Sequence, residues 1–162
     1  MRLFLALFAL LCLSACARKV ENPTIVQMRV RTMQTRTFAG ADLKKVMKET
    51  IAVLQDEGFM IKTANTDIGL LTAERDIDIE KFSSKFWAYF FSGKRATWKK
   101  HSTVEITTNI MEDKGGTKIR INFLVRVFDN LGRVLDVHQV MEEEAYQDFF
   151  NKIQKGIIAS DS

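Results

Sequence analysis

The sequence is poor in cysteine, histidine and proline. Its two cysteines, Cys12 and Cys16, stand close to the start, so no cysteine is left in the rest of the chain for a disulfide framework. Two histidines, His101 and His138, lie far apart, and their spacing supplies no partners for a zinc site. We therefore expect a domain held together by its apolar core, with no metal and no cofactor.

The motifs of several enzyme classes are also missing. The chain contains no GxSxG, no GxxxxGK[ST] and no GxGxxG sequence, which are the signatures of serine hydrolases, P-loop proteins and dinucleotide-binding proteins. The formal net charge is only +4, and no basic helix or stripe of the kind used by nucleic-acid-binding modules recurs. These absences favour a noncatalytic protein that does not bind nucleic acid.

An apolar run without the length of a membrane-spanning helix follows Arg2. It covers residues 3–13 and ends at Ser14, whereas a spanning helix needs about 20 apolar residues. A short basic start and a short apolar core are typical of a secretory signal peptide. We predict that residues 1–15 are a signal peptide.

The four residues LSAC, from Leu13 to Cys16, resemble the lipobox of bacterial lipoproteins at all four positions. That resemblance implies that Cys16 becomes the first mature residue and carries lipid, including palmitate, on its sulfur and amine. The alternative is an ordinary signal peptide with a chance cysteine. Because Ala17, and not aspartate, follows the cysteine, the resemblance also implies an outer-membrane lipoprotein that faces the periplasm, if the host has such an envelope.

The residues after Cys16 are polar and include the single proline, Pro23. We expect residues 16–24 to be a lipidated N-terminus and tether, and residues 25–160 to form one domain. Hydrophobic periodicity in that domain predicts strands at 25–38, 59–63, 69–75, 104–110, 119–127 and 133–140, and helices at 42–58 and 142–159. The acidic first turn at Glu142, Glu143 and Glu144 suits the start of the second helix.

The predicted order is β, α, β, β, insertion, β, β, β, α. It indicates an α+β fold in which an antiparallel sheet of five to six strands carries two helices on one face. The stretch VLQDEGFMIKTANTDIGLLTAE, residues 53–74, resembles small helix-grip lipoprotein domains, such as the lipoprotein subunit of the outer-membrane β-barrel assembly machine. This resemblance implies an accessory or scaffold role in an envelope assembly.

The insertion at 76–101 contains the most unusual composition in the chain. Aromatic residues crowd beside basic ones in KFWAYFFSGKRATWKKH, residues 85–101. One interpretation is an interfacial segment that contacts a membrane or a ligand, and the other is a cap whose aromatic rings lie in the core. The candidate contact residues are Trp87, Tyr89, Phe91, Lys94, Arg95, Trp98, Lys99 and Lys100.

Two further candidates come from the strands. The exposed face of the 119–127 strand presents Arg120, Asn122 and Arg126, which we predict to contact another envelope protein. Asp76, Asp78 and Glu80 alternate as in a calcium loop, but the glycine and distal glutamate of such a loop are missing, so a solvated strand edge is the better interpretation. An alternative function is binding of a lipid or other apolar ligand between the sheet and the C-terminal helix.

Overall fold

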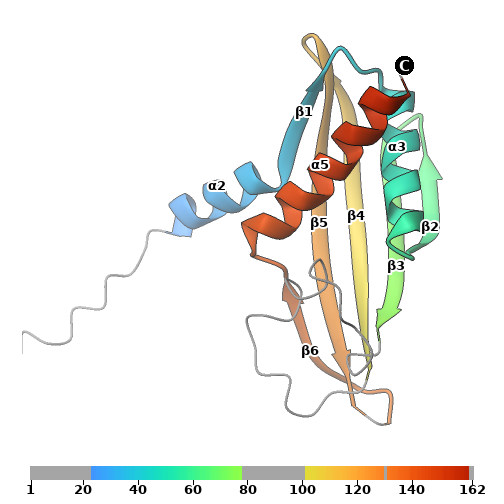
Figure 1. The fold of residues 1–162 in the computed structure, drawn as a ribbon. Coiled ribbons are helices and arrows are strands. Elements are labelled where there is room, and N and C mark those ends of the chain that lie inside the picture. Colours follow the sequence, from blue (N-terminus) through green and yellow to red (C-terminus); the bar gives the residue numbers. More distant parts are fainter. Residues whose placement is uncertain (1–22, 78–100, 130, 161–162) are drawn as a thin grey trace, which may run out of the picture.

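The computed structural model describes residues 23–77, 101–129 and 131–160 (Figure 1). The elements in chain order are α2 (Pro23–Met33), β1 (Thr35–Ala39), α3 (Leu43–Asp56), β2 (Met60–Asn65), β3 (Leu70–Ile77), β4 (His101–Asp113), β5 (Gly116–Phe128), β6 (Val134–Gln139) and α5 (Glu143–Ala159). No helix in these ranges has both the length and the apolar character needed to span a membrane.

All six strands form one antiparallel sheet, which confirms the predicted α+β class. Strands β2, β3, β4 and β5 lie side by side in that order. Beyond β5 the edge is shared, because β1 pairs with Gly116–Arg120 of β5 while β6 pairs with the part of β5 from Leu124 to Phe128. Strand β5 therefore has two neighbours on one side, from opposite ends of the described chain.

The long β4–β5 hairpin supplies the middle of the core. Its side chains alternate between buried and exposed positions along both strands, as expected for a sheet with one covered face. The covered face carries Val104, Ile106, Ile119, Ile121 and Phe123, each at most 1% exposed. Helices α3 and α5 both lie over this face (Figure 1), and the opposite face is called the outer face below.

The first predicted helix is confirmed, and Asp42 caps its start. The Oδ1 atom of Asp42 accepts a hydrogen bond from the backbone N–H of Lys45 at 2.7 Å, which satisfies one of the donors that a helix start leaves unpaired. The helix buries one side against the sheet, at Val46, Met47, Thr50, Val53 and Leu54. A guanidinium N–H of Arg75 on β3 donates to the carbonyl oxygen of Glu57, so the C-terminal end of α3 is tied to the sheet.

The C-terminal helix packs on the sheet through aromatic rings. Tyr146 and Phe149 lie 4.9 Å and 5.5 Å from Phe123, measured between ring centroids, and all three side chains are fully buried. Arg36 of β1 lies over the Phe150 ring and donates to the Asn151 side chain at 2.9 Å. These contacts attach α5 to β5 and to β1.

The predicted strand at 25–38 is wrong over most of its length. Residues from Pro23 to Met33 form α2, and only Thr35–Ala39 is a strand. The alternation of Val26, Met28 and Val30 suggested a strand, but Val26, Val30 and Met33 also follow helical spacing and are partly buried, whereas Met28 is 65% exposed. Pro23 suits the first position of a helix because its missing N–H would have no intrahelical partner there.

The remaining boundaries move by a few residues. The sheet continues through Ile77 and resumes at His101, so both ends of the predicted insertion belong to strands β3 and β4. Helix α2, which was not predicted, begins inside the segment that was predicted to be a tether. The fold class is therefore right, while the element at the start of the domain is not.

Candidate functional site

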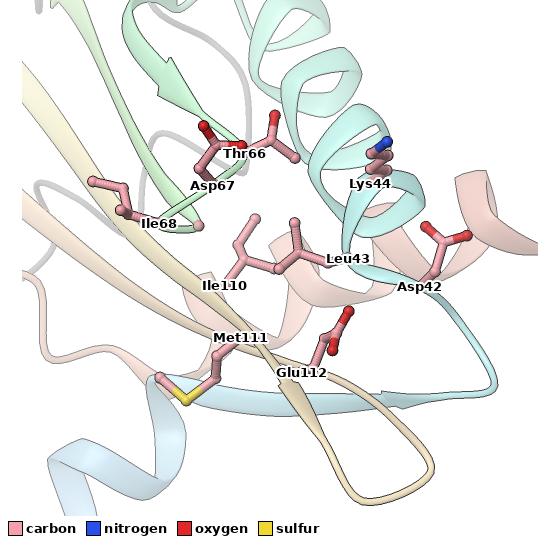
Figure 2. A pocket seen from close by; sticks show the side chains of 10 residues that line it. Asp42, Leu43, Lys44, Thr66, Asp67, Ile68, Ile110, Met111 and Glu112 are labelled. Carbon is pink, nitrogen blue, oxygen red and sulfur yellow. The ribbon is translucent and has the colours of Figure 1, made fainter.

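A cleft of about 590 Å³ opens at one end of the sheet, between the start of α3 and the turn that joins β2 to β3. Figure 2 shows Leu43 and Ile110 at its centre, with Asp67 and Glu112 on opposite sides of them. We call this site the acidic cleft. It is lined by Asp42, Leu43, Lys44, Thr66, Asp67, Ile68, Gly69, Ile110, Met111 and Glu112.

Local hydrogen bonds fix the β2–β3 turn that forms one wall of the acidic cleft. The Asn65 side-chain oxygen accepts from the backbone N–H groups of Asp67 and Ile68, at 3.0 Å and 3.3 Å. Gly69 then adopts a φ of 63°, a conformation that favours glycine. Its carbonyl oxygen accepts from the Ile110 N–H at 2.7 Å, which attaches the turn to β4.

The wall charges are mostly acidic. The Asp42 carboxylate already caps α3, and it accepts from the Lys45 N–H. Within the described ranges, the Glu112 and Asp67 carboxylates and the Lys44 ammonium make no hydrogen bond or ion pair. The acidic cleft thus combines an apolar floor with two carboxylates whose charge is not neutralised by a described neighbour.

A smaller groove of about 260 Å³ continues from the acidic cleft along α3. The two share Lys44 and Thr66 in their linings. The groove runs between α3 and β2, over the side chains of Met47, Ile51 and Ala64. Together they form an elongated depression with a largely apolar lining, an acidic end, and two lysines, Lys44 and Lys48, along the groove.

The predicted partner surface lies on β5, where its three residues share the outer face by alternation. Arg120 is exposed. Arg126 forms an ion pair with Glu105 of β4 at 2.9 Å. Asn122 is only half-exposed, and its side-chain oxygen accepts from the Gln34 side chain at 3.2 Å, so it also holds the start of β1 against β5.

Several predicted site residues lie outside the described residues. They are the lipidation site and the membrane or ligand contacts, namely Cys16, Trp87, Tyr89, Phe91, Lys94, Arg95, Trp98, Lys99 and Lys100. Of the calcium-like group, Asp78 and Glu80 also fall there. Asp76 is described, and it accepts from the Thr103 hydroxyl at 2.6 Å near the exposed ring of His101, as a solvated strand edge would.

A serine, a histidine and an aspartate share the covered face of the sheet but do not form a catalytic triad. His138 and Asp136 of β6 are linked at 3.1 Å, and the buried Oγ of Ser102 on β4 has no hydrogen-bond partner among the described residues. Strand β5 lies between β4 and β6, and His138 is also displaced by two residues along the strand, so Ser102 and His138 lie about 12 Å apart, far beyond hydrogen-bond distance. In the described part of the chain, no three His, Cys, Asp or Glu side chains converge as metal ligands would.

The region between the sheet and α5 was the predicted site for an apolar ligand. In the described residues its centre is filled by Phe123, Tyr146 and Phe149, which pack ring against ring, and a pocket of about 230 Å³ lies only at the β1 side, between α2, β1 and α5. The acidic cleft and its adjoining groove lie instead along α3.

Three groups with shifted pKa values serve the fold. Burial raises the pKa of the Tyr146 phenol, whose hydroxyl donates to the Val140 carbonyl at 2.8 Å. Burial lowers the pKa of the Lys152 ammonium, but hydrogen bonds to Glu57 and Asp148 outweigh it and raise that pKa overall. Hydrogen bonds from Arg133 lower the pKa of the Asp129 carboxyl, which organises the turn before β6.

The acidic cleft was missed at the sequence level because its walls come from three distant segments. Only the turn gave a local signal, since Asn65 and Gly69 bracket it with residues suited to tight turns. Nothing in the sequence pattern indicated that this turn lies opposite the start of α3. That proximity depends on the packing of the helix on the sheet.

Comparison with known proteins finds similarity to solved structures alone. No family model matches the chain, and no curated protein matches it. A solved structure of a DUF4468 family protein from Bacteroides ovatus is similar, with 7% identity and a TM-score of 0.42, over 76% of this chain and 84% of that chain. A similarity this distant shows neither the family nor the function of this chain.

Proposed function

We propose that the chain is a lipid-anchored lipoprotein of the cell envelope whose folded domain binds another envelope protein and carries out no chemistry. The LSAC sequence at Leu13 to Cys16 supports the anchor, and the absence of aspartate after Cys16 favours the outer membrane. A domain held to a membrane by its N-terminus needs a folded surface for its partner. The acidic cleft is the observation that carries this binding role.

The residues that line the acidic cleft indicate which side chains a partner segment should carry. An apolar lining at Leu43 and Ile68 favours aliphatic or aromatic side chains, and Asp67 and Glu112 favour a lysine or arginine beside them. The elongated shape, continued by the groove along Ile51, suits an extended peptide better than a compact small molecule. The occupant is therefore a basic, partly apolar segment of another envelope protein.

Site-specific photo-crosslinking in cells tests the binding role. Ile68 is 63% exposed on the β2–β3 turn, and a photoreactive amino acid placed there in the full-length chain should trap one heavier protein. Charge reversal by Asp67→Lys with Glu112→Lys should abolish the adduct. Asp56→Lys, which reverses one carboxylate at the far end of α3, is the control for charge reversal away from the acidic cleft and should leave the adduct intact.

Two results would contradict the binding role: recovery of the uncrosslinked chain alone, or an adduct that survives the charge reversal. A second photoreactive position at Arg120 tests the predicted β5 surface in the same experiment. The anchor has its own test, because radiolabelled fatty acid should attach to the wild-type chain and not to Cys16→Ser. Labelling that is equal in both chains would refute lipidation at Cys16.

A further inference from the structure

Five of the eleven exposed large apolar side chains in the described residues lie on β6 and its flanks. Val134, Leu135 and Val137 of β6 are 54%, 48% and 49% exposed. Leu131 in the preceding turn and Met141 just after the strand are 77% and 47% exposed. Valine and leucine on an exposed sheet edge are unusual in a monomeric protein, since such an edge is a template for pairing with another chain.

The outer edge of β6 carries backbone groups that β5 does not use. The Val140 N–H donates to the Phe123 carbonyl at 3.0 Å, so Phe123 and Val140 form a hydrogen-bonded pair. Hydrogen-bonded and non-bonded pairs alternate along an antiparallel ladder. Val137, opposite Arg126, and Gln139, opposite Leu124, therefore direct their N–H and C=O groups away from β5.

Strand β6 has a β-bulge at its Val134 end and the inward-facing charge of Asp136, but around Val137 it lacks the two residue types that most directly block pairing. Natural edges are blunted by lysine or proline, and β6, with the sequence VLDVHQ, contains neither. Strand β2, at the opposite edge, does carry Lys62, which pairs with Glu74. The two edges of the sheet thus differ in their suitability for pairing.

We infer that two copies of this chain pair through their β6 strands, antiparallel about a two-fold axis at Val137, so that two sheets join into one. With Val137 opposite its counterpart, the register places Asp136 of each copy opposite His138 of the other. Asp136 and His138 already lie 3.1 Å apart within each strand. In the dimer, each aspartate would therefore have a histidine beside it on its own strand and another opposite it on the partner strand.

This complementarity is what selects a second copy as the occupant. Moving the axis by one residue, to Asp136 or to His138, would place like side chains opposite each other and use backbone groups that already bond to β5. Only odd positions offer outward N–H and C=O groups, and Val137 is the one that also pairs Asp136 with His138. The inference goes beyond the proposed function and does not depend on the lipid anchor or on the occupant of the acidic cleft.

Disulfide formation tests the register. In a hydrogen-bonded antiparallel pair the opposing Cα atoms lie about 5.5 Å apart, within the range that a disulfide bridges. The full-length chain with Val137→Cys, solubilised in detergent and oxidised, should become a covalent dimer. Gln139→Cys should not, because in this register its counterpart lies about 13 Å away, four residues along the strand.

Equal cross-linking at positions 137 and 139, or none at either, would overturn the inference. A disulfide between Val137→Cys and a different protein in cells would also overturn it, because the edge would then serve a foreign strand. Leu131→Cys, more exposed but distant from the axis, is the matched control for random collision and should cross-link no more than Gln139→Cys.

Mass measurement of the intact assembly gives a second test without cysteine. Val137→Pro removes an outward N–H and leaves the ladder with β5 in place, so it should convert the dimer to a monomer. If that variant fails to fold, Val137→Lys places two ammonium groups opposite each other and should raise the dimer dissociation constant by about tenfold or more. Leu131→Ser should leave the dimer intact; a Val137→Lys chain that dimerises as tightly as the wild type would contradict the inference.

Discussion

The carbonyl oxygen of Gly69 accepts a 2.7 Å hydrogen bond from the N–H of Ile110, and no side chain separates the two backbones. A Cβ atom on Gly69 would lie 1.7 Å from the Ile110 carbonyl oxygen. The φ of 63° at Gly69 adds a second restriction, since other L-residues rarely adopt it. This contact closes one wall of the acidic cleft.

Gly69→Ala should therefore destabilise the domain by about 2 to 5 kcal/mol, from the positive φ and the backbone clash together. Chemical denaturation followed by circular dichroism measures the change. Gly40→Ala is the control, because Gly40 also has a positive φ of 73° but has no atom within 4 Å of the added Cβ. Equal losses for both variants would show that the close approach to Ile110 contributes nothing.

Asp42→Ala removes the hydrogen bond to the Lys45 N–H and should cost about 1 kcal/mol of unfolding free energy. Asp42→Asn keeps a capping oxygen and should recover most of that loss. Asp56→Ala, at the other end of the same helix, should cost little, because an acidic residue there is not favoured by the helix dipole. Thermal unfolding of the three variants compares them, and an equal loss in all three would argue against capping.

Tyr146→Phe deletes the hydroxyl that donates to the Val140 carbonyl and should lower stability by about 1 kcal/mol near neutral pH. Burial raises the pKa of this phenol above its ordinary value of 10.0, so the unfolded chain loses the proton first as the pH rises. The stability advantage of the wild type is present below about pH 10 and decreases above it. The difference in Tm between wild type and Tyr146→Phe should shrink from about pH 9 to about pH 11, and a constant difference would contradict this account.

The aromatic segment at 85–101 has a test that separates its two interpretations. Trp87→Ser with Phe91→Ser, in a chain that starts at residue 17, should weaken binding to vesicles containing anionic phospholipid and leave the Tm unchanged if the rings contact a membrane. If the rings belong to the core, the Tm should collapse while vesicle binding stays the same. Sedimentation with vesicles and thermal unfolding give the two readouts.

The sequence predicted the sheet well because its strands alternate strictly. The pattern from Ile119 to Val127 placed every other side chain on the covered face, and the structure buries those residues. The segment from Ile25 to Met33 failed because its apolar residues fit both a strand and a helix. Pro23 and the packing of α2 against β1 and α5 both favour the helix. The proline can be read from the sequence, whereas the packing requires tertiary structure.

The candidate sites depend on distances that no local pattern encodes. Arg120 and Arg126 reach the outer face by simple alternation, whereas Asn122, in the same series, is engaged by Gln34 from a distant part of the chain. The acidic cleft requires the start of α3 to approach the β2–β3 turn. The order of charged and apolar residues along the chain does not indicate that these two segments lie close together.

The shared edge of β5 has a consequence for the order in which the molecule assembles. Strand β1 leaves the ribosome early, yet its only described sheet partner, Gly116–Arg120, is made much later, and β6 follows later still. Until then the nascent chain must keep Phe38 from aberrant contacts, because that side chain is buried only in the finished sheet. Synthesis speed and holding factors should thus influence the yield of this protein more than that of a helical bundle of equal size, whose contacts are local.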